Sequence, residues 1–212
     1  MPAYICVTCG TQFSPSDKEP ERCPICDEPR QFVPLSGQPW TTHEALARRH
    51  CNAFRQHEPG LIGIGTVPAF AIGQRALLLM TEEGNVLWDC ISLLDEATIA
   101  IVKGLGGLIG IAISHPHYYA SMVEWAHAFD APLHLHAGDR QWVMRGDPAI
   151  EFWDGDTLSL ARGVTLIRCG GHFAGGTVLH WARGAQKRGT LLSGDIVQVI
   201  PDRKFVTFMR SY

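Results

Sequence analysis

Two pairs of cysteines near the N-terminus have the spacing of a metal site. Cys6 and Cys9 form one CxxC pair, Cys23 and Cys26 form a second, and thirteen residues separate the pairs. Two such turns bring four thiolates into the tetrahedron that zinc prefers. A segment of about thirty residues with few large apolar side chains could hardly fold without that ion. The spacing therefore predicts a four-cysteine zinc ribbon over residues 1–30.

Three histidines and one aspartate form a second candidate metal site. His115 and His117 follow an apolar run, and alternate residues of an extended segment point the same way, so both imidazoles can share one ion. His172 lies in a glycine-rich loop, and Asp195 follows another apolar run. Three imidazoles with an open position are typical of a catalytic zinc site, where the ion lowers the pKa of its water to about 7.

The order and spacing of these residues resemble the metallo-β-lactamase superfamily. Its members carry an HxHxDH motif, then a histidine in a GHTPGS-like loop, then an aspartate in a GD pair after a strand. The corresponding segments here are HPHYYA at 115–120, GHFAGG at 171–176 and GD at 194–195, and NVLWD at 85–89 resembles the early strand that ends in aspartate. The resemblance covers about residues 60 to 210. It implies an αβ/βα sandwich, of the α/β (α+β) class, over residues 60–212.

This chain departs from the family motif at two ligand positions. Tyr119 and Ala120 stand where the family has the aspartate and histidine that bind mainly a second metal. The chain also stops at Tyr212, before the place of the family's last histidine, so we expect some C-terminal elements to be missing. The resemblance thus implies one ion held by the three remaining histidines. Asp195 would complete its coordination sphere or hold a bound water.

Three functions are compatible with these residues. The first is metal-dependent hydrolysis, with Asp195 orienting the water and with Tyr118 or Tyr119 donating a hydrogen bond to an oxyanion, since a phenol with a pKa of about 10 is a poor base. In the second, His115, His172 and Asp195 form the two-histidine, one-carboxylate set of a non-haem Fe(II) oxygenase, and the persulfide dioxygenases of this fold use equivalent positions. The third is a catalytically degenerate protein with a structural metal and a docking ribbon. Zinc or iron is the expected ion, and the small-molecule substrate is not identified.

The ribbon also has two interpretations. Its cysteine pattern is similar to that of rubredoxin, where iron replaces zinc, which would make it a redox or partner-binding module. Rubredoxins have a much longer stretch between the two pairs, and closed thiolate sites are usually structural, so we favour structural zinc. The other three of the seven cysteines, Cys51, Cys90 and Cys169, are scattered, and this odd count without a secretory signal argues against a disulfide framework.

The composition limits the class of protein and its partners. With 46% hydrophobic and 18% charged residues, the chain is typical of a soluble globular protein. A net charge of −3 provides no basic surface for nucleic acid. The start lacks the features of a signal peptide, and the apolar stretch Ile99–Ile113 is too short to span a bilayer. We therefore expect a cytoplasmic protein without nucleic-acid or membrane partners, and a homodimer that covers apolar surface left by an early chain end.

The elements that must position the two sites follow from apolar runs and turn signals. Residues 31–59 are predicted to be a linker and a helix, because prolines punctuate its start and Thr41 with Glu44 has capping-box spacing for a helix that continues to His57. Interposed strands and helices predict sheets with covering helices. We expect strands at 67–72, 76–80, 85–90, 108–113, 132–136, 164–168, 177–181, 190–193 and 205–209, and helices at 95–103, 120–129 and 138–144.

Overall fold

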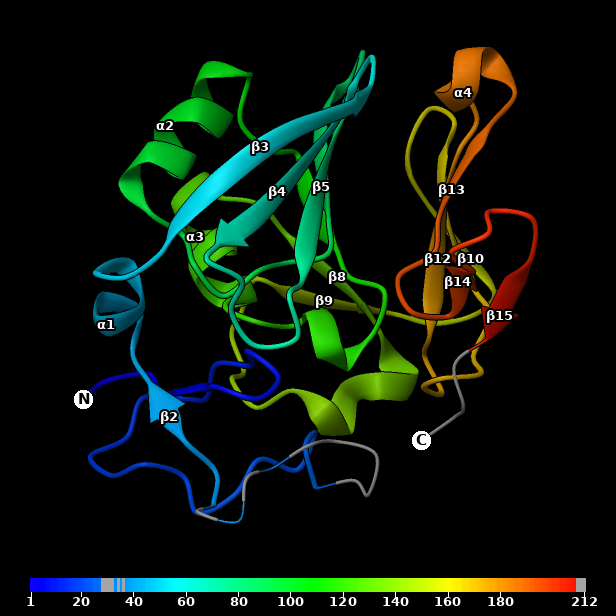
Figure 1. Ribbon diagram of the computed structural model, residues 1–212. Coiled ribbons are helices and arrows are strands. Elements are labelled where there is room, and N and C mark those ends of the chain that lie inside the picture. The colour runs from blue at the N-terminus through cyan, green and yellow to red at the C-terminus, as the bar shows by residue number, and fades with distance from the viewer. Residues whose placement is uncertain (28–32, 34, 36, 209–212) are drawn as a thin grey trace.

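A seven-stranded sheet forms the larger half of the protein. The computed structural model describes residues 1–27, 33, 35 and 37–208. The strands follow one another in the order of the chain, antiparallel as far as β6 and parallel from β6 to β9 (Figure 1). They are β3 (Cys51–Glu58), β4 (Leu61–Val67), β5 (Arg75–Thr81), β6 (Gly84–Trp88), β7 (Gly110–Ala112), β8 (Leu133–His136) and β9 (Ile150–Trp153).

The parallel strands are joined by crossovers, as parallel pairing requires. Helix α2 (Glu96–Gly104) joins β6 to β7, α3 (Met122–Phe129) joins β7 to β8, and the 3₁₀ helix η2 (Ala137–Trp142) lies between β8 and β9. The carboxyl ends of β6, β7 and β8 therefore meet at one edge of the sheet. This is the edge at which open α/β sheets bind their ligands.

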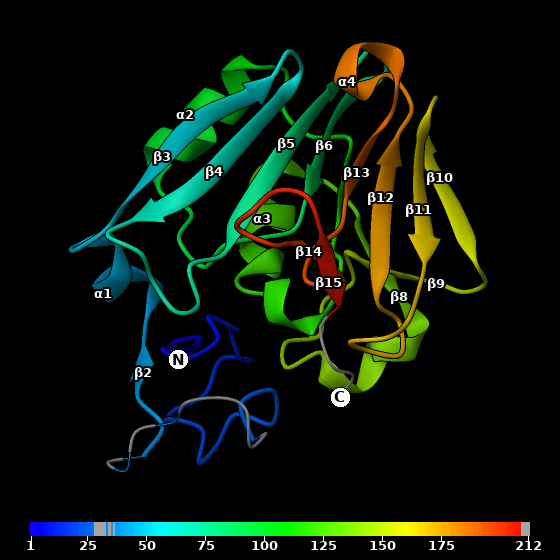
Figure 2. The same cartoon turned by 45° about the vertical axis from the view of Figure 1, so that its right-hand side comes forward.

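A second, antiparallel sheet packs against the first. Its strands are β10 (Thr157–Ala161), β11 (Val164–Arg168), β12 (Thr177–Trp181) and β13 (Thr190–Leu192), in that order. Figure 2 shows the two sheets side by side. Alternate apolar residues of both sheets fill the space between them, among them the buried side chains of Leu79, Val86, Trp88, Leu166, Leu179 and Trp181. The period-2 alternation of these runs thus becomes an inter-sheet core.

Helices α2 and α3 cover the other face of the large sheet. Val102 of α2 and Trp125 of α3 are fully buried in one cluster with Leu87, Ile111 and Leu133 of the strands. Within the described ranges, both helices of eight or more residues lie on this sheet. The αβ/βα class is thus confirmed. The helical layer formed by α2 and α3 lies on the larger sheet. Asp95 caps α2, since its side chain accepts a hydrogen bond from the Thr98 N–H at 2.8 Å.

The N-terminal segment lies at the lower end of the sheets in both views (Figures 1 and 2). Its two short strands, β1 (Ile5–Cys6) and β2 (Trp40–Thr41), pair antiparallel, and α1 (His43–Ala47) leads into β3. The remaining elements are η1 (Pro116–Tyr118), α4 (Gly184–Lys187), β14 (Val197–Val199) and β15 (Val206–Phe208). None of the helices in the described part of the chain has the length and apolar character of a bilayer-spanning segment.

Three of the predicted elements were wrong. The helix predicted to reach His57 ends at Ala47, and residues 51–58 form the edge strand β3, because long-range pairing with β4 outweighs the local helix signals. The strand predicted at 67–72 lies earlier, at Leu61–Val67. The helix predicted at 138–144 is the 3₁₀ helix η2.

Strands β1, β2, β9, β10 and β14 were not predicted either. The domain limits at residues 30 and 59 stay predictions. Residues 28–32, 34 and 36 of the predicted linker, and residues 209–212, lie outside the described residues.

Candidate metal centres

The four ribbon cysteines lie together, as their spacing predicts. All four sulfur atoms are buried and lie within 4.8 Å of one another. The Sγ atoms of Cys6 and Cys26 are 3.7 Å apart, as are those of Cys9 and Cys23. Sulfurs about 2.3 Å from a tetrahedral zinc ion would be separated by about 3.8 Å. The cluster therefore fits one tetrahedral ion.

Hydrogen bonds to Cys6 favour its thiolate form. The neighbouring thiols of Cys23 and Cys26 lower the pKa of Cys6 well below its ordinary value because they interact with its sulfur, whereas the same kind of contact raises the pKa of Cys9 and Cys26, so the cluster favours a thiolate at Cys6. The Cys9 N–H and the Gln38 side-chain amide also donate to this sulfur, at 3.4 Å and 2.9 Å. Negative charge is thus stabilised where a cation would bind.

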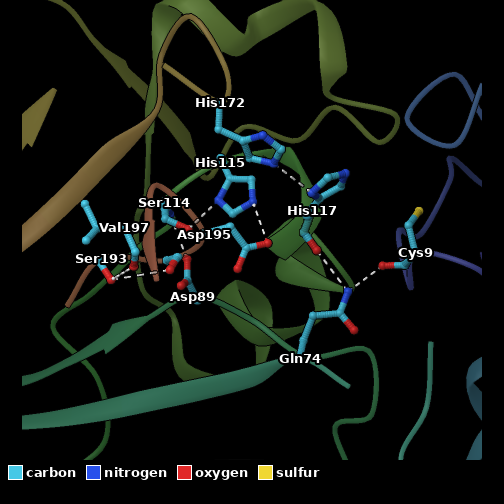
Figure 3. A network of polar contacts seen from close by, with 11 residues as sticks. Cys9, Gln74, Asp89, Ser114, His115, His117, His172, Ser193, Asp195 and Val197 are labelled. Carbon is cyan, nitrogen blue, oxygen red and sulfur yellow. Dashed lines mark hydrogen bonds and ion pairs between the residues drawn. The ribbon is translucent and has the colours of Figure 1, made fainter. Parts of the chain in front are cut away.

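The three histidines and the aspartate of the second predicted site also come together (Figure 3). His115 follows β7, His117 lies in η1, His172 lies in the loop between β11 and β12, and Asp195 lies between β13 and β14. One ligand atom from each lies within 4.8 Å of all the others. Three separate segments, one that follows β7 of the large sheet and two that follow β11 and β13 of the second sheet, therefore converge on one point.

The distances in this cluster fit a single tetrahedral ion. His172 Nε2 lies 3.2 Å from His117 Nδ1, and His115 Nε2 lies 3.4 Å from Asp195 Oδ2. Ligand atoms about 2.0–2.1 Å from a tetrahedral ion would be about 3.4 Å apart. Among the described residues, the buried His115 Nε2 makes no hydrogen bond. A buried polar atom without a hydrogen bond is costly, and coordination to a cation would satisfy it.

Asp195 and Tyr118 both lie beside His115. Burial alone would raise the pKa of Asp195, but the adjacent His115, with His117 and His172, lowers it below its ordinary value. The Tyr118 ring lies 5.3 Å from the His115 ring, centre to centre. Burial raises the pKa of Tyr118 above its ordinary value. At neutral pH the site therefore holds a carboxylate and a neutral phenol.

Tyr119, the tyrosine that we expected at the site, faces elsewhere. It is 2% exposed and packs in the core beneath α3. Together with Ala120 it lines a small space shared with Thr11 and Gln12 of the ribbon. The two positions that depart from the family motif thus lie between the ribbon and the body of the protein. The structure places Tyr118, rather than Tyr119, against an imidazole.

Ser114 and Asp89 form a chain of hydrogen bonds that ends at His115. Ser114 Oγ lies 2.8 Å from His115 Nδ1, and the Ser114 N–H donates to Asp89 Oδ1 at 2.7 Å. Asp89 directly follows β6 and has a left-handed backbone, with φ of 63°. Burial raises the pKa of Asp89 to about 8, and the charge of Asp195 adds to the increase. Such partners fix the ring orientation of a metal-binding histidine. The resemblance pointed to Asp89, whereas sequence reasoning missed Ser114.

Asp139 fixes the loop that carries His172. Its carboxylate is buried and accepts a hydrogen bond from the Gly175 N–H at 2.7 Å. A Cβ atom at Gly175 would lie 2.8 Å from this carboxylate, so the close approach requires glycine. The nearby His136 has both ring nitrogens within hydrogen-bonding distance, one of the Gly155 carbonyl and one of the Gly138 N–H. The His136 ring nitrogens are thus engaged by the backbone, and His136 is not among the residues of the metal cluster.

Gly194 positions Asp195 and tolerates no side chain. It has φ of +53°, and a Cβ atom there would lie 2.4 Å from Ser114 Oγ and 3.4 Å from His115 Nδ1. We predict that Gly194→Ala displaces Ser114 and weakens zinc binding about 10- to 100-fold, as loss of a ligand's supporting contact does. Gly146→Ala is the control, because a Cβ there meets no atom within 4 Å. Equal zinc affinity in both variants, measured by chelator competition, would contradict this role.

Comparison with known proteins places the chain in a family. No family model matches it. It is 48% identical to the uncharacterized protein YmaE of Bacillus subtilis (strain 168) over 214 residues, which covers 100% of this chain and 78% of YmaE. The DIM-1 metallo-β-lactamase exposed to ceftazidime superposes with a TM-score of 0.58 at 11% identity, over 71% of this chain and 72% of that one.

A second solved structure is similar at lower coverage. The SMB-1 metallo-β-lactamase in complex with mercaptoacetic acid has a TM-score of 0.48 at 17% identity, and the match covers 62% of this chain and 59% of that one, less than two thirds of its length. At these identities the solved structures show the fold alone. The chain belongs to the same family as YmaE and has a metallo-β-lactamase fold.

Proposed function

We propose that this chain is a metal-dependent hydrolase that uses a single ion held by His115, His117 and His172. The observation that carries the proposal is the convergence of these three imidazoles and Asp195 within 4.8 Å, with the buried His115 Nε2 lacking a hydrogen bond among the described residues. The metallo-β-lactamase fold supports a hydrolase, and Tyr119 and Ala120 support one ion rather than two. The substrate is not identified.

A bound divalent ion would supply an activated water with a pKa of about 7 and would polarise a carbonyl or phosphoryl oxygen. The protein side chains perform the remaining tasks. Asp195 stays ionised at neutral pH, so its carboxylate can accept a hydrogen bond from a water and orient it. The protonated Tyr118 hydroxyl can donate to a developing oxyanion. Tyr119, buried in the core, is the weaker donor candidate.

The third imidazole favours hydrolysis over oxygen chemistry. A non-haem Fe(II) oxygenase needs two histidines and one carboxylate. His117 Nδ1 lies only 3.2 Å from His172 Nε2, so the third imidazole shares the site. Three histidines with an open position are one of the ligand sets of catalytic zinc sites. We therefore propose zinc at this centre and structural zinc in the ribbon.

The test is hydrolysis by the zinc-loaded full chain. We predict that the wild type hydrolyses at least one of a chromogenic cephalosporin, an ester, a lactone and a phosphodiester. His172→Ala should lower that rate about 1,000-fold, because a catalytic ion contributes several kcal/mol and each 1.36 kcal/mol is a factor of ten. His127→Ala is the control, since the His127 side chain is 54% exposed and pairs with Asp147 away from the cluster. A rate unchanged by His172→Ala, or iron-dependent oxygen consumption by the wild type, would contradict the proposal.

A further inference from the structure

One buried glutamine joins the two metal centres. Gln74 precedes β5 and is 7% exposed. Its Nε2 donates to the carbonyl of Cys9 in the ribbon at 2.5 Å and to the carbonyl of His117 in the second centre at 2.9 Å (Figure 3). The two N–H groups of one side-chain amide are therefore divided between a ligand residue of each cluster. Each centre constrains the other through this single group.

The ribbon also holds the far end of the same histidine segment. The Gln12 N–H donates to the Ala120 carbonyl at 2.9 Å. Ala120 has a left-handed backbone, with φ of 44°, a conformation that costs free energy in any residue except glycine. The backbone of residues 115–120 is thus anchored at His117 through Gln74 and at Ala120 directly. Both anchors depend on the ribbon being folded.

A series of apolar contacts also connects the ribbon to the histidine cluster. Trp142 packs against the buried four-cysteine cluster on one side. On the other side its ring lies edge-on to the Phe173 ring, with centres 5.7 Å apart. The Phe173 ring lies 4.8 Å from that of His172 and 5.3 Å from that of His117. The ribbon therefore supports, through Trp142, the Phe173 ring that packs against the histidine cluster.

We propose that Gln74 is a positioning residue through which metal loading of the ribbon raises the affinity of the histidine centre for its own divalent ion. The ribbon folds only when its thiolates hold an ion. When the ribbon is unfolded, the Cys9 carbonyl no longer fixes the Gln74 amide. Binding of the ion at the histidine centre must then order residues 115–120, and this ordering reduces the free energy of binding. Thermodynamic linkage makes the coupling reciprocal, so an ion at the histidines also stabilises the ribbon. This inference rests on the metal site of the proposed function.

A double-mutant cycle on zinc affinity tests the coupling without any substrate. One variant replaces all four ribbon cysteines with serine, a second is Gln74→Met, and a third combines them. We measure the dissociation constant of the histidine centre by competition with a chromophoric chelator. Methionine keeps the length of glutamine without its donors, so the ribbon remains intact in the second variant.

We predict that each change weakens zinc binding at the histidine centre about 10- to 100-fold, the range measured for lost supporting contacts of a ligand. The combined variant should bind no more weakly than the serine variant, because both changes break the same connection. Ser92→Ala is the matched control. Ser92 Oγ donates to the carbonyl of Gly10, next to Cys9, at 2.7 Å, so this variant removes a ribbon contact without touching His117. Its affinity should stay within about threefold of wild type.

Three results would overturn the coupling: equal affinity in the serine variant and the wild type, additive losses in the combined variant, or a loss in Ser92→Ala as large as that in Gln74→Met. The last would mean that ribbon docking in general, rather than Gln74, sets the affinity. Failure of the wild type to bind a second ion would contradict the proposed function as well. A second ion that binds equally well in every variant would contradict the coupling alone.

Discussion

Replacing His115 with alanine should abolish the stabilisation that zinc gives to the body of the protein. An ion that binds only the folded state stabilises it by about 2.7 kcal/mol at a concentration 100-fold above its dissociation constant. His115 contributes one of three imidazoles, and its Nε2 is the atom that lacks a hydrogen bond among the described residues. Its removal leaves too few ligands for tight binding. We therefore expect the zinc-dependent rise in melting temperature to vanish.

The measurement compares melting temperatures with and without zinc after the ribbon has been saturated. His127→Ala should keep the full zinc-dependent rise, since that side chain lies away from the cluster. The apoprotein of His115→Ala should be less stable than the wild-type apoprotein, because the substitution removes a buried ring and its hydrogen bond with Ser114, so the zinc-dependent rise is compared within each variant. A zinc-dependent rise in His115→Ala equal to that of the wild type would show that the ion binds elsewhere.

Replacing Cys23 and Cys26 together with serine should unfold the ribbon and leave the two sheets folded. A structural zinc site of this kind contributes about 10–16 kcal/mol of apparent binding free energy, and two thiolates cannot retain it. The clusters of buried residues within the sheets include none of the ribbon cysteines. We therefore expect proteases to cut within residues 1–27 while residues 51–199 remain resistant.

Limited proteolysis with mass spectrometry checks this result. Cys51→Ser is the control, because Cys51 is an exposed thiol on β3 and lies outside both clusters. It should be cut no faster than the wild type. A double variant that resists proteolysis within residues 1–27 as the wild type does would show that the ribbon folds without its ion.

The ligand sets of both candidate centres could be predicted because their signals are local. The CxxC pairs and the HxH motif each place two ligands on one short segment, and the order of the later motifs supplied His172 and Asp195. Supporting residues could not be found in this way. Gln74 and Asp139 act on Cys9, His117 and Gly175, which are 36 to 65 residues away along the chain. Only the folded chain brings such pairs into contact.

The errors in the predicted elements have a similar origin. The capping-box spacing pointed to Thr41, but the neighbouring Thr42 caps the helix, which has only five residues. Residues 51–58 then form a strand because they pair with the apolar strand Leu61–Val67, a contact that local helix signals do not contain. The sequence could not choose between the adjacent Tyr118 and Tyr119 as the hydrogen-bond donor, because only the folded turn decides which ring lies beside an imidazole. Tyr118 faces His115, and Tyr119 enters the core.

Anomalous diffraction from crystals of the zinc-loaded protein tests the one-ion centre most directly. We predict two peaks at the zinc edge in each chain. One should lie among the four ribbon sulfurs, and the other should lie about 2.0–2.2 Å from the nearest atoms of His115, His117 and His172. Asp195 should lie beside the second peak, bound to the ion or to its water. Two peaks within the histidine cluster, or none, would contradict a single-metal hydrolytic centre.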